Sequence, residues 1–366
     1  MKLSFRLPIN IDVLVVDKTA YKVLSSSVLN NMNHANIVFD KRHLNISLKV
    51  AIYFMGLLKE VMIDICCLGS IKGIFSTIYR YLALSALKAI KPKIVITFID
   101  DSSLFGWLSE KYKEATFYSI QNGTRTQKAL KEQTVVIPNY FCFGDYEVEE
   151  MSPYWKVNSY IPVGSLMSSV FMEKKEPLCS HYDIVLISQQ PNLLTRASGV
   201  AAESASLMDD YLSRYVSENN LKFAVACRYK NNSLEIGYYK SKYGRNVELV
   251  FRDDAAMACY QAMYSSELVV TFYSTAAREA AGWGRKVLFC DFTNTNLYNN
   301  FQSGLWIFRE RSYKNFAERM TGVMRMSKIE YERETKDYFK KIMYFNSVVP
   351  TYRIIRNELV KVLNCK

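Results

Sequence analysis

The residues that suggest chemistry most directly lie late in the chain, where two hydroxyl side chains follow a short apolar run. Ser274 and Thr275 come directly after residues 268–272, which are predicted to form a buried strand, and open a predicted helix over residues 275–282. The first turn of a helix has N–H groups without a partner, and the helix dipole adds partial positive charge, so this position favours an anion. The pattern predicts a phosphate-binding site.

The same predicted helix supplies a carboxylate and several small side chains. Glu279 lies one turn further on and is suited to accept hydrogen bonds from the hydroxyls of a ribose or another sugar. A simpler interpretation is that Ser274 or Thr275 is only an N-cap with a carboxylate in the first turn. Small residues favour the phosphate interpretation, because they let the helix approach a neighbour or a ligand closely. They are Ala276, Ala277, Ala280, Ala281 and Gly282.

A second candidate loop follows the predicted strand over residues 116–120. Gln121, Asn122, Gly123 and Arg125 combine a tight Asn-Gly turn with amide and guanidinium groups, which suit hydroxyls, carboxylates or phosphates. We expect this loop to bind an acceptor or a sugar. An ordinary Asn-Gly turn without a ligand is the alternative.

A third candidate is the carboxylate pair at the end of the predicted strand over residues 93–99. Asp100 or Asp101 can act as a base, as a nucleophile or as a group that binds hydroxyls, and we assign the catalytic role to this pair. We also expect one of them to cap the helix that begins near Ser103. The two carboxylates are adjacent rather than separated by one residue, so a metal-dependent sugar-nucleotide site is not indicated, and we expect no metal and no cofactor.

A fourth candidate follows the predicted strand over residues 222–227. Arg228 and Lys230, with Tyr229 between them, would meet a diphosphate or an anionic sugar across a cleft from Ser274. A solvated basic loop explains them equally well. The three histidines, His34, His43 and His181, sit in no pattern typical of a catalytic triad or a metal site.

Short apolar runs alternate with longer helical stretches along the whole chain, which is the pattern of parallel sheets with crossover helices. We predict an α/β protein of two Rossmann-like domains, 1–165 and 166–366, because the stretch over residues 146–176 is rich in Pro, Ser, Met and charge. In such domains ligands bind where strands end and helices begin. All four candidate loops occupy that position.

Composition narrows the class of partner. The 366 residues include 47 Lys and Arg against 35 Asp and Glu, for a net charge of +12, which favours anionic partners. The basic residues are scattered rather than gathered in one patch, so nucleic acid is not expected. Eight cysteines without a C-x-x-C pattern and an N-terminus without an apolar signal core predict a cytoplasmic protein.

The most apolar region, residues 48–90, is interrupted by seven charged side chains, so it is not a spanning segment. We interpret it as amphipathic helices that pack on a core. Peripheral contact with an acidic membrane surface, at the cytoplasmic face of the inner membrane, is the alternative that the basic charge and the many aromatic side chains leave open.

Several of these segments together resemble bacterial surface-carbohydrate biosynthesis proteins, the capsule and O-antigen glycosyltransferases of GT-B fold. The resemblance rests on VLVVD at 13–17, PKIVITFIDD at 92–101, YSIQNGTR at 118–125, Phe143-Gly144, and the stretch over residues 260–289. It covers most of the chain in order, with short motifs. Asp101 departs from the pattern, because an Asn is expected after Asp100.

The resemblance implies a GT-B-like fold with two parallel sheets that face each other across a cleft. It implies a nucleotide-sugar donor on the C-terminal domain, a glycan or lipid-linked acceptor on the N-terminal domain, and a last helix that returns to the first domain. Ser274 and Thr275 match a phosphate-binding Ser-Thr pair. Some similar transferases use CMP-activated 3-deoxy-manno-octulosonic acid (Kdo), an anionic donor that suits the positive charge.

The leading hypothesis is therefore a metal-independent glycosyltransferase of polysaccharide biosynthesis. A UDP-sugar epimerase or a polyol-phosphate transferase on the same fold is one alternative. A non-catalytic, basic assembly or nucleic-acid-binding protein is another, and it predicts salt-dependent affinity for polynucleotide and none for sugar nucleotides.

Overall fold

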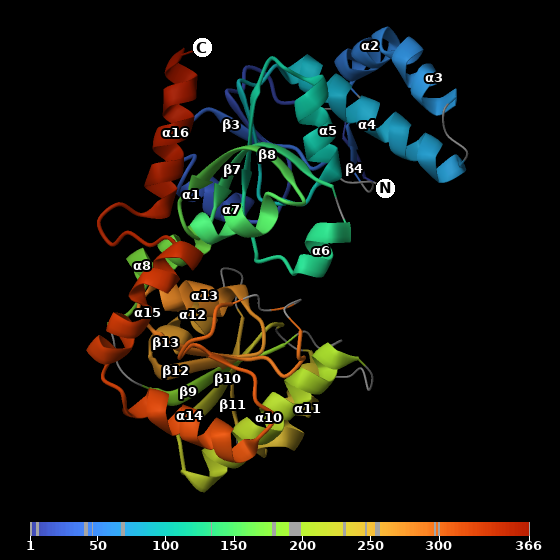
Figure 1. Ribbon diagram of the computed structural model, residues 1–366. Coiled ribbons are helices and arrows are strands. Elements are labelled where there is room, and N and C mark those ends of the chain that lie inside the picture. Colours follow the sequence, from blue (N-terminus) through green and yellow to red (C-terminus); the bar gives the residue numbers. More distant parts are fainter. Residues whose placement is uncertain are drawn as a thin grey trace.

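The computed structural model describes residues 2–4, 7–39, 43–45, 47–66, 70–132, 134–177, 181–189, 199–229, 232–245, 247–252, 257–295, 298 and 301–365. Its main features are two six-stranded parallel sheets, one in each half of the chain, with helices on the faces of both (Figure 1).

The first sheet has the strand order β3-β2-β5-β6-β7-β8, and each neighbouring pair is parallel. Its strands are β2 (Val13–Val15), β3 (His34–Asn36), β5 (Ile94–Thr97), β6 (Thr116–Ile120), β7 (Val136–Cys142) and β8 (Lys156–Pro162). A separate two-stranded sheet joins β1 (Lys2–Ser4) to β4 (His43–Asn45). The central strands β2 and β5 are buried along their whole length, as continuous apolar strands covered on both faces must be.

Helices cover both faces of the first sheet. They are α1 (Tyr21–Ser26), α2 (Leu48–Gly56), α3 (Leu58–Cys66), α4 (Ile71–Ile90), α5 (Ser103–Lys111), α6 (Gln127–Glu132), α7 (Asp145–Met151) and α8 (Leu166–Lys174). On one face Leu14 packs with Leu84 and Leu87 of α4, and on the other face Val13 packs with Leu24 of α1. Serines start α2, α4 and α5 as N-caps, since the hydroxyl of each accepts a hydrogen bond from an amide in the first turn.

The second sheet has the order β11-β10-β9-β12-β13-β14 and is also parallel. Its strands are β9 (Tyr182–Ile187), β10 (Phe223–Cys227), β11 (Glu248–Phe251), β12 (Ser266–Thr271), β13 (Lys286–Cys290) and β14 (Ile307–Phe308). The helices of this half are α10 (Val200–Glu218), α11 (Ser233–Tyr243), α12 (Met257–Tyr264), α13 (Thr275–Gly282), α14 (Tyr313–Arg325) and α15 (Lys328–Ile342).

Each sheet has one point where the strand order reverses. The reversal falls between β2 and β5 in the first sheet and between β9 and β12 in the second. Ligands of open α/β sheets bind outside the carboxyl ends of the strands at such a point. The loops after β5 and β12, which hold Asp100 and Ser274, are therefore in the position where this topology forms a site.

The last helix, α16 (Thr351–Cys365), belongs to the core of the first half. Ile355 and Leu359 are fully buried in the cluster that contains Val13, and the helix stands beside the first sheet in Figure 1. The limits 1–165 and 166–366 for the domains stay a prediction.

Between α15 and α16 the chain passes against two glycines, which follow strands β7 and β8 of the first sheet. The Tyr344 amide donates to the Phe143 carbonyl at 2.7 Å. A Cβ on Gly144 would overlap the carbonyl oxygen of Lys341, and one on Gly164, whose φ is +82°, would overlap that of Tyr344. Only glycine lets the crossing segment, residues 341–344, lie this close.

Among the described residues, no helix is both long enough and apolar enough to cross a bilayer.

Candidate functional site

The candidate site lies where the loop after β6 meets the start of α13. The Thr124 amide donates to Thr275 Oγ1 at 2.9 Å, and the two hydroxyl oxygens are 3.2 Å apart. The Tyr273 hydroxyl donates to the Thr124 carbonyl at 3.0 Å. The structure thus brings together two predicted segments, 121–125 and 274–275, that are about 150 positions apart in the sequence.

The start of α13 has the geometry expected of a capped helix. Ser274 is the N-cap, and its hydroxyl accepts from the Ala276 amide at 3.2 Å. Ala277 and Ala280 are fully buried in the core of the second half, so the small side chains let α13 pack closely on its sheet. Ser274 is therefore an N-cap, but the first turn of α13 holds no carboxylate, contrary to the simpler interpretation. A role of this helix start in binding phosphate stays a prediction.

Asp100 lies at the centre of a buried polar cluster on the first sheet. Its side chain has no exposed surface, and it accepts hydrogen bonds from Arg125 Nη2 and, at 2.6 Å, from the Tyr140 hydroxyl. Burial raises the pKa of Asp100 to about 6, against the opposing effects of the Arg125 charge and of the Tyr140 hydrogen bond. A carboxyl group with this pKa can exchange a proton near neutral pH.

Asp101 differs from its neighbour. Its side chain is 41% exposed, and its Oδ2 is 3.7 Å from Arg125 Nη2. The expectation that one of the two aspartates caps the next helix is wrong, because Ser102 is the N-cap of α5 and its hydroxyl accepts from the Phe105 amide at 3.2 Å. Asp100 is held by Arg125 and Tyr140 instead.

The amides of the predicted acceptor loop brace the ends of neighbouring strands. Gln121 is buried, and its Oε1 accepts from the Phe143 amide at 2.7 Å. Asn122 donates to the Phe98 carbonyl at 2.7 Å, and its Oδ1 accepts from Arg125 at 3.0 Å. Gly123 lies close to both segments, since a Cβ there would lie 3.2 Å from Arg125 Nη1 and 3.5 Å from Thr275 Oγ1. Their role in binding an acceptor or a sugar stays a prediction.

A second buried carboxylate, Glu147, reaches across to the second half and was missed from the sequence. It lies in the first turn of α7, with its Oε1 3.7 Å from Arg278 Nη1 of α13, and both side chains are at most 5% exposed. Burial raises the pKa of Glu147 to about 7, while Arg278 and a hydrogen bond with Gln121 lower it and the nearby Asp100 charge raises it. The signal that we overlooked is a carboxylate in the helix start after Phe143-Gly144.

Glu279 is fully engaged by protein groups. Its carboxylate is buried and accepts from the hydroxyl of Ser165, the N-cap of α8, and from Tyr260 at 2.8 Å. Burial raises its pKa to about 7. In this arrangement Glu279 joins α13 to the junction between β8 and α8, and its predicted contact with a sugar hydroxyl stays a prediction.

Arg228 ends β10, which is separated from β12 by β9. The amides of Arg228 and Tyr229 donate to Glu235 at 2.8 and 3.2 Å, and the fully buried Glu235 also accepts from the Ser188 hydroxyl at the end of β9. Glu235, which the sequence analysis did not single out, therefore shapes this edge of the second sheet. Lys230 lies outside the described residues.

The described residues offer groups that suit a phosphate but no cluster that suits a metal ion. Hydroxyls and helix amides at Ser274 and Thr275, with the guanidinium of Arg228 on the same sheet edge, suit a phosphate. No group of three or more His, Cys, Asp or Glu side chains in the described part of the chain is arranged to hold a metal ion.

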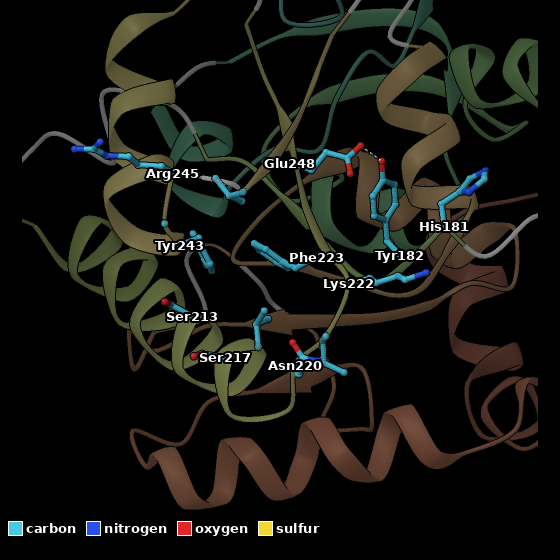
Figure 2. A pocket seen from close by; sticks show the side chains of 14 residues that line it. His181, Tyr182, Ser213, Ser217, Asn220, Lys222, Phe223, Tyr243, Arg245 and Glu248 are labelled. Atoms are coloured by element: carbon cyan, nitrogen blue, oxygen red, sulfur yellow. Dashed lines mark hydrogen bonds between the residues drawn. The ribbon is translucent and has the colours of Figure 1, made fainter.

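A hollow on the second half lies at the opposite edge of its sheet. This cavity of about 720 Å³ is bordered by the amino ends of β9, β10 and β11 (Figure 2). Figure 2 shows that His181, Lys222 and Arg245 point in different directions rather than toward one point, and that Tyr182 is hydrogen-bonded to Glu248. The basic side chains do not converge on a ligand, so we do not assign the site here.

Comparison by sequence gives no relative: no protein-family model and no curated protein matches the chain.

Comparison of the fold with solved structures does find similar proteins. MnaA of S. aureus, in a co-structure with UDP, has a TM-score of 0.58 at 9% identity, with 97% of both chains covered. The UDP-GlcNAc 2-epimerase of Neisseria meningitidis bound to UDP-GlcNAc has a TM-score of 0.52 at 14% identity, over 97% of this chain and 100% of the other. The wall teichoic acid polymerase TagF has a TM-score of 0.56 at 10% identity, over 98% and 90%.

These likenesses establish the fold. The predicted α/β class, with two parallel sheets in a GT-B-like arrangement, is confirmed. The part of the resemblance that concerns Kdo transferases stays a prediction.

Proposed function

We propose that the protein acts on a nucleotide-activated sugar and is a glycosyltransferase that transfers the sugar to a surface polysaccharide or a lipid-linked acceptor. The observation that carries this proposal is the contact of Thr124 with Thr275, which sets a hydroxyl-rich helix start opposite the cluster around Asp100. Similar solved structures that hold UDP or UDP-GlcNAc on the same fold support it.

The donor would bind on the second half. Phosphate oxygens would take the place of the Thr124 amide at Thr275 and would receive hydrogen bonds from Ser274 and from the amides of the first turn of α13. Arg228 and Lys230 would add positive charge. Glu279 would accept from a ribose hydroxyl after release of Ser165 or Tyr260, which donate to its two carboxylate oxygens. The Thr124 amide is hydrogen-bonded to the Thr275 hydroxyl in this structure. Binding of the donor would break this bond, and the two halves would move apart slightly.

The acceptor would bind on the first half, held by Gln121, Asn122, Gly123 and Arg125. Asp100, with a pKa of about 6, is mostly ionised at neutral pH and would take the proton from the attacking hydroxyl. The acceptor oxygen would form a bond to the anomeric carbon, and the bond from that carbon to the phosphate oxygen would break. The start of α13 would stabilise the charge on the departing nucleotide.

Epimerisation of a UDP-sugar is the second candidate, because two of the carboxyl groups of raised pKa, Asp100 and Glu147, lie near the same loop. Asp100 and Glu147 interact electrostatically, and both contact the loop over residues 121–125. A pair of groups that titrate near pH 6 and pH 7 can remove a proton from one face of a carbon and return one to the other. The similar UDP-GlcNAc 2-epimerases favour this candidate as well.

One experiment separates the candidates. The protein is incubated with UDP-, CMP-, GDP- and dTDP-sugars and with a CDP-polyol in deuterated water, with and without a lipid-linked glycan acceptor. A transferase extends the acceptor and leaves the donor alone unchanged, whereas an epimerase converts the donor alone and introduces deuterium at the inverted carbon. If no nucleotide sugar is converted and a polynucleotide binds with strong salt dependence, the proposal is wrong.

A further inference from the structure

The outward side of α2, α3 and the start of α4 carries large apolar side chains in an unusual number. Six of them, each between 54% and 73% exposed, define what we call the outer apolar face. They are Ile52, Met55, Met62, Ile63, Ile71 and Phe75. Figure 1 places α2 and α3 at the outer end of the first half, on the far side from the second half.

This face is additional to the one that the helices use for packing. Among the described side chains, α2 buries Val50 and α3 buries Val61, and both helices pack on α4. A surface helix of a globular protein normally shows polar residues on the side away from the core. The sequence-based expectation that residues 48–90 are amphipathic helices packed on a core therefore accounts for only one side of α2 and α3. Exposed apolar side chains gathered on three neighbouring helices are typical of an interaction site.

Positive charge accompanies the outer apolar face. Lys49, Lys59 and Lys72 are exposed, and the segment over residues 48–91 has six basic side chains and two acidic ones, a net charge of +4. One of the two acidic groups, Asp64, accepts a hydrogen bond from Tyr81 at 2.9 Å. A hollow of about 620 Å³ beside α2 is lined by Ile52, Lys49 and Lys91, among others. Lysine next to apolar side chains suits a surface that is apolar inside and anionic outside.

We propose that the outer apolar face docks on the surface of a bilayer that contains anionic lipids. The apolar side chains would enter the boundary between headgroups and acyl chains, and the lysines would meet lipid phosphates. A second copy of the chain fits less well, because a symmetric contact would bring the lysines of both copies together with few acidic partners. The inference does not rest on the proposed function.

Vesicle sedimentation tests the proposal with the full chain. We expect at least tenfold stronger binding to vesicles of phosphatidylglycerol and phosphatidylcholine than to phosphatidylcholine alone. The variant Ile52→Gln/Met62→Gln/Ile63→Gln/Phe75→Gln should bind at least tenfold more weakly. Lys49→Gln/Lys59→Gln/Lys72→Gln should weaken binding at least fivefold and reduce its dependence on salt. Since all these side chains are exposed, thermal unfolding should stay unchanged.

A matched control changes four exposed apolar residues of the second part of the chain. Val200→Gln/Leu234→Gln/Ile329→Gln/Val348→Gln alters side chains that are between 50% and 81% exposed and should bind vesicles as the unaltered chain does. The proposal fails if the unaltered chain does not sediment with anionic vesicles, if neutral vesicles bind it equally, or if the control loses binding to the same extent. It also fails if sedimentation equilibrium shows a dimer that only the variant of the outer apolar face lacks.

Discussion

The two edges that meet at the candidate site are built from different chemistry. On the first sheet, the edge is a buried network of charged and amide groups. Arg125 donates to Asp100 and to Asn122, and Gln121 accepts from the Phe143 amide at the end of β7. On the second sheet, the edge is a helix start with two hydroxyls and small side chains, where Ser274 and Thr275 are only partly buried. Asp100 on the first edge has a raised pKa, and the helix start on the second edge offers hydrogen-bond donors.

The difference indicates a division of labour. Groups that exchange protons need a defined pKa, which burial and a fixed cation supply on the first edge. A phosphate carries its own charge and needs only oriented donors, which a helix start supplies without any charged side chain. We therefore expect changes on the first edge to affect turnover and changes on the second edge to affect nucleotide affinity.

The largest expected effect is that of Asp100→Asn. It removes the proposed base, so turnover should fall at least about 100-fold while nucleotide affinity stays within about threefold. In the unaltered protein, turnover should fall as the pH drops below about 6, because Asp100 becomes protonated, and the variant should lack this acidic limb. Initial rates measured from pH 5 to pH 8 provide the check.

Asp101→Asn is the matched control for that variant. The Asp101 side chain is 41% exposed, and its ion pair with Arg125 is long, at 3.7 Å. Removing this weak interaction should change turnover less than about threefold. Should Asp101→Asn abolish turnover while Asp100→Asn does not, the roles assigned to the two aspartates are reversed.

Gly144→Ala should destabilise the first edge, where the crossing segment passes. The new Cβ would overlap the carbonyl oxygen of Lys341, which is a backbone atom and cannot rotate away as a side chain can. We therefore expect the free energy of unfolding to fall by more than about 2 kcal/mol. Gly237→Ala is the control, since no atom lies within 4 Å of a Cβ there and the residue is inside α11. It should stabilise the protein by up to about 1 kcal/mol. Urea denaturation measures both, and equal effects would contradict the close approach.

Thr275→Val tests the second edge with little change in shape. It removes the hydroxyl that accepts from Thr124 and that would contact a phosphate, so nucleotide affinity should fall about tenfold with turnover of bound donor nearly unchanged. Thr116→Val, at the start of β6, is the control and should leave the affinity unchanged. Calorimetric titration gives the affinities. A fall in turnover without a fall in affinity would contradict the role of Thr275 in nucleotide binding and indicate a role in catalysis.

The smallest expected effect concerns the pH dependence of stability. Burial raises the pKa of Glu279 from 4.5 to about 7, so its contribution to stability is complete below pH 4.5 and is lost as the pH rises through about 7. Glu279→Gln should reduce the loss of stability between pH 5 and pH 8 by on the order of 1 kcal/mol. Glu149→Gln, an exposed change on α7, should not. Thermal unfolding at both pH values decides, and identical pH profiles for the two variants would contradict the burial of Glu279.

Most of the secondary structure could be predicted from apolar runs and turn residues. Strands over residues 116–120 and 286–290 and the helix over residues 275–282 agree with the structure residue for residue. The errors have local causes. The apolar residues 37–39 predict a strand, but β3 spans His34–Asn36. Pro138 predicts two short strands, 135–138 and 140–143, where the structure has one, β7. β8 is half exposed and polar, so the stretch that contains it was interpreted as a linker.

The loops that form the site could be predicted from the sequence, but the contacts between their side chains could not. The sequence pattern indicates residues 100–101, 121–125 and 274–275, because each segment follows the carboxyl end of a parallel strand. Which aspartate is buried, and that Glu147 meets Arg278, depends on contacts between distant segments that no local pattern encodes. The same holds for Tyr140 and Glu235, which look like ordinary strand and helix residues.

The central claim is that a nucleotide binds at the start of α13, opposite the loop after β6. Amide hydrogen exchange followed by mass spectrometry, with CMP, UDP, GDP and dTDP added in turn, tests it most directly. One of these nucleotides should slow exchange several-fold over residues 121–126 and 273–278 and leave residues 213–223, beside the hollow of Figure 2, unchanged. Slower exchange beside that hollow, or no change with any nucleotide, would contradict the account.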